Sequence, residues 1–271
     1  MFIILMLIIT AIAAYYGYAL LNHAWPFTGI DLNQTGVFGD SWGAFTSIFS
    51  ALGFCGVLWT INLQKKATEK IEEDARKREE SEKIRDFENS FFNILSVLQT
   101  IINDMRVVNK RREVLAEGRS IFLYYFKSFK QDIKDNDLLT TFFEKNSYTD
   151  TYLARKNLLY IYKSYFSLRT QNLSHYFRYL YNAFKFIDES SIDDDFKKKY
   201  ANILRAQLSD YELIILFYNS LTKNGYKFQK YFSSYAVLDN LPIEKLLSKH
   251  QVVFVNKKCW GGNKLAINEY N

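Results

Sequence analysis

Residues 42–83 read WGAFTSIFSALGFCGVLWTINLQKKATEKIEEDARKREESEK, and their character changes once, after residue 63. Residues 42–63 carry no charged side chain, and as a helix they extend about 33 Å, enough to cross the apolar core of a bilayer. Residues 64–83 are polar on nearly every face with both signs of charge interleaved, which is typical of a solvated helix held by i,i+4 pairs. No Gly or Pro lies between Gly56 and Gly118. We therefore predict a membrane span that continues directly into a charged helical stalk.

A second uncharged stretch, FIILMLIITAIAAYYGYALL at residues 2–21, is also long enough to span. A cleaved signal peptide is the alternative, but the basic segment that normally precedes one is missing. We expect residues 1–63 to form a transmembrane hairpin with spans at about 2–21 and 42–63. Lysines follow the second span and the intervening loop has no Lys or Arg, so both termini should be cytoplasmic; these lysines are Lys65, Lys66 and Lys70.

Small residues recur along the second predicted span at the spacing that lets helices approach closely in lipid. They are Gly43, Ser47, Ala51, Gly53 and Gly56. Their partner could be the first span of the same chain or a second protomer, and small residues are also simply frequent in membrane helices. The sequence leaves these three interpretations open.

The charged pattern of the stalk ends at Ile84. From there to Met105, apolar residues recur at intervals of three and four. Between Gly118 and Gly225 no Gly or Pro interrupts the chain, which predicts an all-α fold. We assign residues 84–250 to a cytoplasmic helical domain and residues 251–271 to a C-terminal tail. Within the domain we expect helices around 119–129, 137–168, 173–188, 196–222 and 226–236. Only QVVFV, residues 251–255, resembles a strand.

Composition excludes several classes of protein. The two cysteines, Cys55 and Cys259, lie far apart, and the three histidines are scattered, so neither a disulfide framework nor a metal site is indicated. No phosphate-binding loop, nucleophile elbow or dinucleotide fingerprint occurs, and we expect no cofactor. The net charge of +6 suits a surface beside anionic lipid. Because the basic runs lack interleaved aromatic residues, a nucleic-acid partner is not expected.

The segment LSHYFRYLYNAFKFID, residues 173–188, predicts an aromatic helix with a polar edge. His175, Arg178 and Asn182 share one face of that helix, and Tyr176 stands next to them. This polar stripe is either a structural network or a pocket for a ligand.

A second helix, expected from Arg205 to Asn219, repeats the pattern. Arg205, Ser209 and Glu212 fall at i, i+4 and i+7, with Gln207 between them. If the two helices pack together, Glu212 would pair with Arg178 or Arg205, since a buried guanidinium needs a carboxylate.

A catalytic interpretation of the first helix is also open. Arg169 and His175 have the spacing used by a class of helical ribonucleases, in which such a pair would act on the scissile phosphate and the ribose hydroxyl. Thr170 follows Arg169, where that pattern favours Asn, Asp or His.

Six segments, taken in order, resemble the phage abortive-infection proteins of the AbiC-like group. They are GVFGDSWGAFTSIFSALGFCGVLWTINLQ (36–64), FENSFFNIL (87–95), GRSIFLYYF (118–126), LSHYFRYLYNAFKFID (173–188), YANILRAQLSDYELIILFYN (200–219) and YAVLDNLP (235–242). At the start of the first segment, FGDSWG stands where that group more often has an aromatic pair after the Asp.

The resemblance implies a bacterial membrane-anchored protein that limits phage spread by abortive infection, and it supplies no mechanism. We expect the protein to act in the inner membrane as an infection sensor, a membrane-disturbing effector, or both. The resemblance implies no catalytic residues. The expected partners are the lipid bilayer, a phage component as trigger and a second copy of the chain. A membrane-tethered ribonuclease that uses Arg169 and His175, and a scaffold that recruits a partner effector, are the alternatives.

Overall fold

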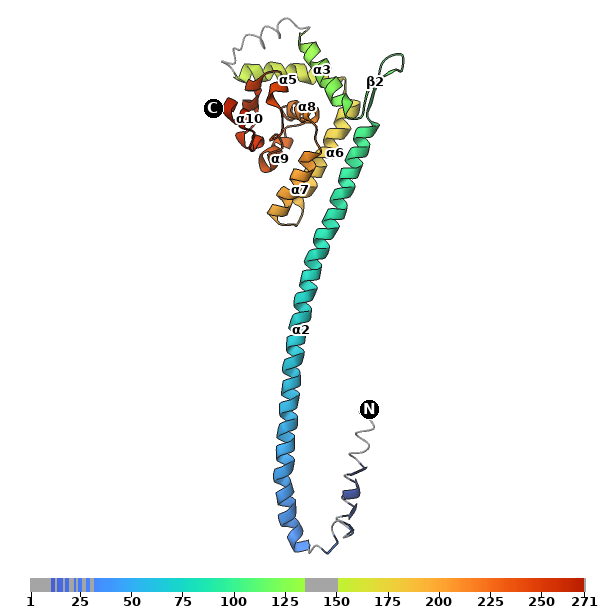
Figure 1. The fold of residues 1–271 in the computed structure, drawn as a ribbon, viewed down its shortest axis with the longest axis vertical. Helices are drawn as coiled ribbons and strands as arrows, with labels where there is room; N and C mark the ends of the chain where they lie inside the picture. The colour runs from blue at the N-terminus through green and yellow to red at the C-terminus, as the bar shows by residue number, and fades with distance from the viewer. Residues whose placement is uncertain are drawn as a thin grey trace. The chain divides into compact units, whose positions relative to one another are not determined.

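The protein is mostly helical, as the sequence predicts (Figure 1). The computed structural model describes residues 32–134 and 151–270, and, in the segment before them, residues 11, 12, 14–16, 18, 19, 22, 24, 25, 28 and 29. The longer elements are α2 (Leu32–Asp104), β1 (Arg106–Val108), β2 (Val114–Glu117), α3 (Ser120–Lys134), α5 (Thr151–Ser167), α6 (Thr170–Glu189), α7 (Asp194–Ala206), α8 (Asp210–Ser220), α9 (Phe228–Tyr235) and α10 (Lys264–Tyr270). Three short 3₁₀ helices lie between α9 and α10: η1 (Ile243–Lys245), η2 (Lys249–Phe254) and η3 (Lys257–Trp260).

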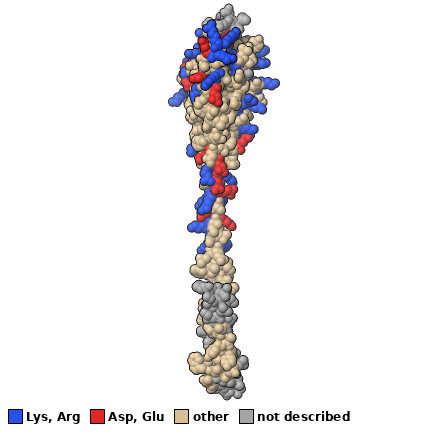
Figure 2. Space-filling model, turned by 90° about the vertical axis from the view of Figure 1, so that its right-hand side faces the viewer, with Lys and Arg blue, Asp and Glu red and all other residues tan. Residues whose placement is uncertain are grey.

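The chain divides into two compact units, residues 1–78 and residues 79–271. In the first unit, α2 from Thr46 onward is the one helix of the described residues that is long and apolar enough to cross a membrane. Its apolar side chains are exposed, with Leu52 at 61% and Trp59 at 70%. Figure 2 shows the interleaved Lys, Arg, Asp and Glu side chains of the charged segment that follows.

The transmembrane hairpin as a whole remains a prediction, because most of the span at residues 2–21 lies outside the described residues. The packing role of the small residues likewise stays a prediction. A Cβ atom built on Gly43, Gly53 or Gly56 would meet nothing within 4 Å. The Ser47 hydroxyl donates to the Gly43 carbonyl oxygen at 2.8 Å, within the helix.

The charged segment is helical and carries i,i+4 ion pairs, as its pattern indicates. Lys77 Nζ lies 2.6 Å from a Glu73 carboxylate oxygen, in the first unit. The apolar stripe that follows packs as expected, with Phe87, Phe91, Leu98 and Met105 buried. The Phe87 ring lies 5.1 Å from the ring of Phe186 on α6 and 4.9 Å from that of Tyr200 on α7. This portion of α2 is therefore part of the core of the second unit.

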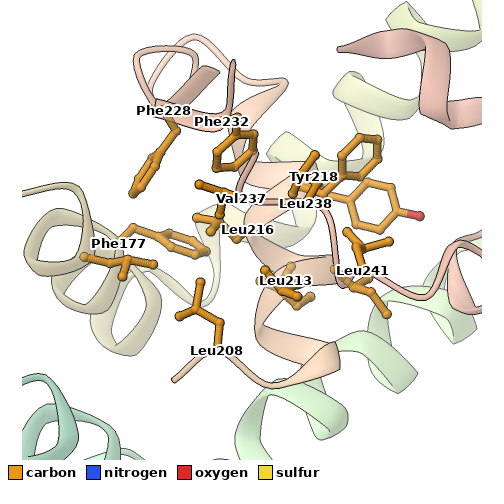
Figure 3. Packing of buried hydrophobic residues seen from close by; sticks show 14 of the residues in the cluster. Phe177, Leu208, Leu213, Leu216, Tyr218, Phe228, Phe232, Val237, Leu238 and Leu241 are labelled. Atoms are coloured by element: carbon orange, nitrogen blue, oxygen red, sulfur yellow. The ribbon is translucent and has the colours of Figure 1, made fainter. Parts of the chain in front are cut away.

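Helix α8 lies at the centre of that unit, and all of its residues from Glu212 to Ser220 are buried. A helix that is apolar on every side needs neighbours on every side. Helices α3 and α5 pack on α8, and Figure 3 shows Leu213, Leu216 and Tyr218 among the surrounding apolar side chains. The ring of Phe129 on α3 stands 5.4 Å from that of Tyr218.

The β1–β2 hairpin was not expected from the sequence. Its strands pair in antiparallel register, with Arg106 opposite Glu117. The Asn109 side chain starts the turn, because its Oδ1 accepts hydrogen bonds from the backbone N–H groups of Arg111 and Glu113, both at 2.9 Å. The available signal was an Asn between Val107-Val108 and Val114-Leu115.

The expectation of a strand at residues 251–255 is wrong. The segment forms the 3₁₀ helix η2, because a strand needs a ladder partner and these residues instead turn their side chains into the core, where Val252 and Phe254 are buried. Residues of the assigned C-terminal tail also pack into the core. Trp260 is fully buried, and its Nε1 donates to the Val252 carbonyl oxygen at 3.1 Å.

Trp260→Ala should therefore destabilise the second unit by about 3–5 kcal/mol, because it empties a filled aromatic site. Urea unfolding of the full chain in detergent, followed by far-ultraviolet circular dichroism, measures this change. Lys258→Ala, at an exposed site two residues away, is the control and should change stability by less than about 0.5 kcal/mol. Equal stability of both variants would mean that residues 251–270 add nothing to the fold.

Candidate functional site

Among the described residues of the second unit, the most buried charged group is Glu212, in the first turn of α8, with no exposed surface. Its Oε2 atom accepts hydrogen bonds from Arg119 Nη1 at 2.7 Å, from the Ser209 backbone N–H at 2.8 Å and from the Ser209 hydroxyl at 2.5 Å. Its Oε1 atom accepts from the Tyr176 hydroxyl at 3.0 Å. We call Glu212, Arg119, Tyr176 and Ser209 the Glu212 cluster.

Arg119 extends the cluster to other elements. Its Nη1 also donates to the Gln207 carbonyl oxygen at 2.6 Å, and its Nη2 donates to Gln99 Oε1 on α2 at 3.2 Å. The residue before it, Gly118, has a φ of +56°, a backbone conformation that side chains with a Cβ rarely adopt. This glycine lets the chain turn from β2 into α3 and places Arg119 against α8.

The prediction of one helix from Arg205 to Asn219 is wrong, because the helix breaks before Ser209. The chain ends α7 at Ala206 and begins α8 at Asp210, with Ser209 as the N-cap. Ser209 and Glu212 form a capping box, in which the serine hydroxyl and the glutamate carboxylate satisfy backbone N–H groups at the helix start. The Ser-x-x-Glu spacing was visible in the sequence and would have predicted this break.

Glu212 consequently pairs with Arg119, and the pairing expected with Arg178 or Arg205 is wrong. Because α7 ends before α8 begins, Arg205 points to a different place. Its Nη1 donates to the Ala236 carbonyl oxygen at 2.9 Å, and its Nη2 lies 3.3 Å from an Asp239 carboxylate oxygen. Arg205 thus fixes the end of α9 rather than the start of α8.

The polar stripe of α6 divides between two hollows. His175 is exposed and lines a shallow hollow together with Asp104 of α2 and Asn172. Arg178 and Asn182 line a second hollow, which we call the Arg178 pocket. Its other walls come from α8, from the turn after α8 and from the start of α9. Tyr176 faces the opposite way, into the Glu212 cluster.

Arg169 has surroundings different from those of His175. Its guanidinium lies 3.6 Å from the centre of the Tyr165 ring, its Nη1 donates to the Tyr165 carbonyl oxygen at 2.9 Å, and its Nη2 donates to the Ser128 hydroxyl at 3.1 Å. Asp132 lies 3.9 Å away. Arg169 thereby joins α3 and α5 to the start of α6, which gives it a structural role beside any catalytic one.

The chemistry of the Glu212 cluster is that of a satisfied buried network. Each oxygen of the carboxylate has a donor, which is what a charge withdrawn from water requires. Burial raises the pKa of the Tyr176 phenol well above its ordinary value, and the negative charge of Glu212 raises it further. Within the described residues, no group of three His, Cys, Asp or Glu side chains is placed to hold a metal ion.

Replacing Tyr176 by Phe should make the free energy of unfolding vary less with pH in the alkaline range. Below a pH of about 10 the phenol keeps its proton in the folded and unfolded states. Above it the unfolded phenol ionises and the folded one does not, so stability falls by about 1.4 kcal/mol per pH unit for this group. Tyr176→Phe removes that contribution, and it also costs about 1 kcal/mol at neutral pH through the lost hydrogen bond.

Urea unfolding between pH 8 and 11 measures both effects. Tyr226→Phe, which removes the same hydroxyl from an exposed ring, is the matched control and should follow the unmodified protein throughout. Identical pH slopes for Tyr176→Phe and the unmodified protein would contradict the assignment of a buried, neutral phenol.

One comparison with known proteins gives a match. Residues 169–246 match the sequence profile of a family described as "Putative phage abortive infection protein". No curated protein and no solved structure matches the chain. The matched region runs from the start of α6 past α9 and includes three of the four residues of the Glu212 cluster together with the Arg178 pocket. Over these residues the match confirms the resemblance to AbiC-like phage abortive infection proteins that was inferred from the sequence.

Proposed function

We propose that the protein is a membrane-anchored antiphage defence protein that acts by abortive infection. The observation that carries the proposal is the family match over residues 169–246. This region contains the buried α8 itself together with α6, α7 and α9, so the resemblance concerns the folded centre of the second unit rather than a peripheral segment.

The anchor is the uncharged part of α2. A helix whose Leu, Phe and Trp side chains are half or more exposed over most of a membrane thickness is unfavourable in water and favourable in lipid. The lysines at residues 65, 66 and 70 follow it directly, which favours a cytoplasmic location for everything after them. The bacterial inner membrane is then the site of action, and a hairpin with both termini in the cytoplasm is the topology we propose.

The same helix could transmit a change from the second unit, where a phage component would be sensed, to the membrane, where the protein would act. Helix α2 contains the uncharged stretch and also the stripe that packs in the second unit, where Gln99 is hydrogen bonded to Arg119 of the Glu212 cluster. A phage component that changes the packing around α6 and α8 would act on α2 through these contacts. Self-association through the small residues of the span would allow several copies to disturb the membrane together.

The first test is phage yield and culture survival at low and high phage input. Cells expressing the protein should release fewer phage, and their cultures should collapse at high input. The double substitution Leu52→Lys and Val57→Lys should abolish both effects, because a charge at the centre of a span costs about 2.5–3.5 kcal/mol and opposes insertion of the second span. Ala67→Lys with Ala75→Lys, in the exposed charged segment, is the matched control and should keep protection.

Other outcomes of the same test separate the alternatives. Protection that survives the Leu52 and Val57 substitutions would contradict the membrane mechanism. RNA fragmentation in infected cells that still hold their membrane potential would favour the ribonuclease. A lack of protection against a broad phage panel when the protein is expressed alone would favour the scaffold.

Coupling through α2 is tested by two insertions of seven residues between Arg78 and Glu79. Seven residues make almost two full helical turns. A helix-forming insert of this length therefore lengthens α2 and nearly preserves the direction in which the side chains before and after it point. A Gly-Ser insert of the same length breaks the helix locally. Protection should be retained with the helical insert and lost with the Gly-Ser insert at matched protein levels in the membrane. Retention with both inserts would contradict mechanical coupling.

A further inference from the structure

The Arg178 pocket is a hollow of about 270 Å³ in the second unit, built from α6, the end of α8, the turn after it and the start of α9. Its charged lining residues are Arg178 and Lys227, and neither Asp nor Glu lines it. Neighbouring cations are neutralised: Lys230 Nζ lies 2.6 Å from Asp188, and Arg205 lies 3.3 Å from Asp239. The pocket is therefore a locally positive site.

Arg178 and Lys227 are both exposed, and in the described part of the chain neither forms an ion pair. The Nε of Arg178 donates to the Ser174 carbonyl oxygen at 3.3 Å on the same helix, which holds the base of the guanidinium and leaves its two terminal nitrogens for a ligand. A guanidinium and an ammonium that line the same pocket, which no carboxylate lines, suit a phosphate group.

The inner end of the pocket offers amides. Asn219 on α8 is only 4% exposed, and Asn182 and Asn224 stand nearer the surface. Each amide supplies both a donor and an acceptor, so it can form hydrogen bonds with the polar edge of a heterocyclic ring. A polar side chain as buried as Asn219 is normally placed where it makes hydrogen bonds.

Gly225 fixes the turn that carries Asn224 and Lys227. A Cβ atom at residue 225 would stand 2.1 Å from the carbonyl oxygen of Asn219 and 2.4 Å from its Oδ1. The turn can lie directly on the end of α8 only because residue 225 has no side chain. The pocket wall is thus held in place and is not a loose surface loop.

Aromatic rings complete the lining. The rings of Tyr181 and Phe228 meet edge to face with their centres 5.4 Å apart, and Phe177 lies across from Phe228 (Figure 3). Flat apolar walls of this kind stack on planar rings. The volume lies just below the usual range for small-molecule sites, about 300–1,000 Å³, which limits the ligand to a small molecule.

We propose that the Arg178 pocket binds a small phosphorylated molecule with a planar heterocyclic ring, of the size of a nucleoside monophosphate. The phosphate lies between Arg178 and Lys227, and the ring lies against the aromatic wall with its polar edge toward Asn219. This proposal stands on the pocket alone and does not depend on the defence function.

Isothermal titration calorimetry on the full chain in detergent tests the proposal, with adenosine and uridine 5′-monophosphates, the two free nucleosides and inorganic phosphate as probes. At least one nucleotide should bind more tightly than its nucleoside and than inorganic phosphate. The double substitution Arg178→Gln and Lys227→Gln should weaken that binding by at least about tenfold, since charge-assisted hydrogen bonds to phosphate are lost. Lys110→Gln with Arg111→Gln, at the exposed hairpin turn, removes the same charges and should bind like the unmodified protein.

Tyr181→Leu tests the contact with the heterocyclic ring separately from the contact with the phosphate. The substitution keeps an apolar wall and removes one aromatic face on which the ring could stack. It should weaken nucleotide binding and leave inorganic phosphate binding unchanged. The absence of nucleotide binding at millimolar concentration, equal affinity for inorganic phosphate and nucleotide, or equal weakening by the control pair would each overturn the proposal. Circular dichroism on every variant establishes that the fold is intact.

Discussion

The carboxylate of Glu212 is the group on which the second unit most depends. A charge withdrawn completely from water costs several kcal/mol unless donors surround it, so its partners have little freedom of position. Those partners come from the start of α3, the middle of α6 and the turn before α8. Through Arg119 the same group also reaches α2. One buried charge therefore orients four helices, which hydrophobic contacts alone do not fix as sharply.

The apolar helix α8 sets the complementary constraint. Residues 213–218 offer no polar face that could meet water, so neighbours have to enclose the helix on every side. Aromatic side chains supply much of that enclosure, with Phe129, Tyr162 and Trp260 around the helix. The richness in Phe and Tyr, which codon usage could have produced by itself, thus has a packing consequence in this fold.

The sequence predicted what depends on local periodicity and missed what depends on distant partners. The 3.6-residue stripe of Phe87 to Met105 and the absence of Gly and Pro were sufficient for the helices. The capping box at Ser209 was readable, although the apolar periodicity concealed it. Nothing near Arg119 indicated that it, rather than Arg178 or Arg205, would reach Glu212, because that contact spans 93 positions. Residues 251–255 looked like a strand only because β-branched residues also fill 3₁₀ helices in a core.

The burial of Val252 and Trp260 also determines the order in which a newly made chain can be completed. The ribosome releases the uncharged part of α2 early, whereas the residues that cover Phe217 come among the last of the core. Until then the nascent body keeps an open aromatic face, which binds chaperones and sticks to other unfinished chains. A chain that ends before residue 252 lacks the side chains that cover this face. Only a chain that extends through Trp260 closes the core over Phe217, with the two ring centres 5.9 Å apart.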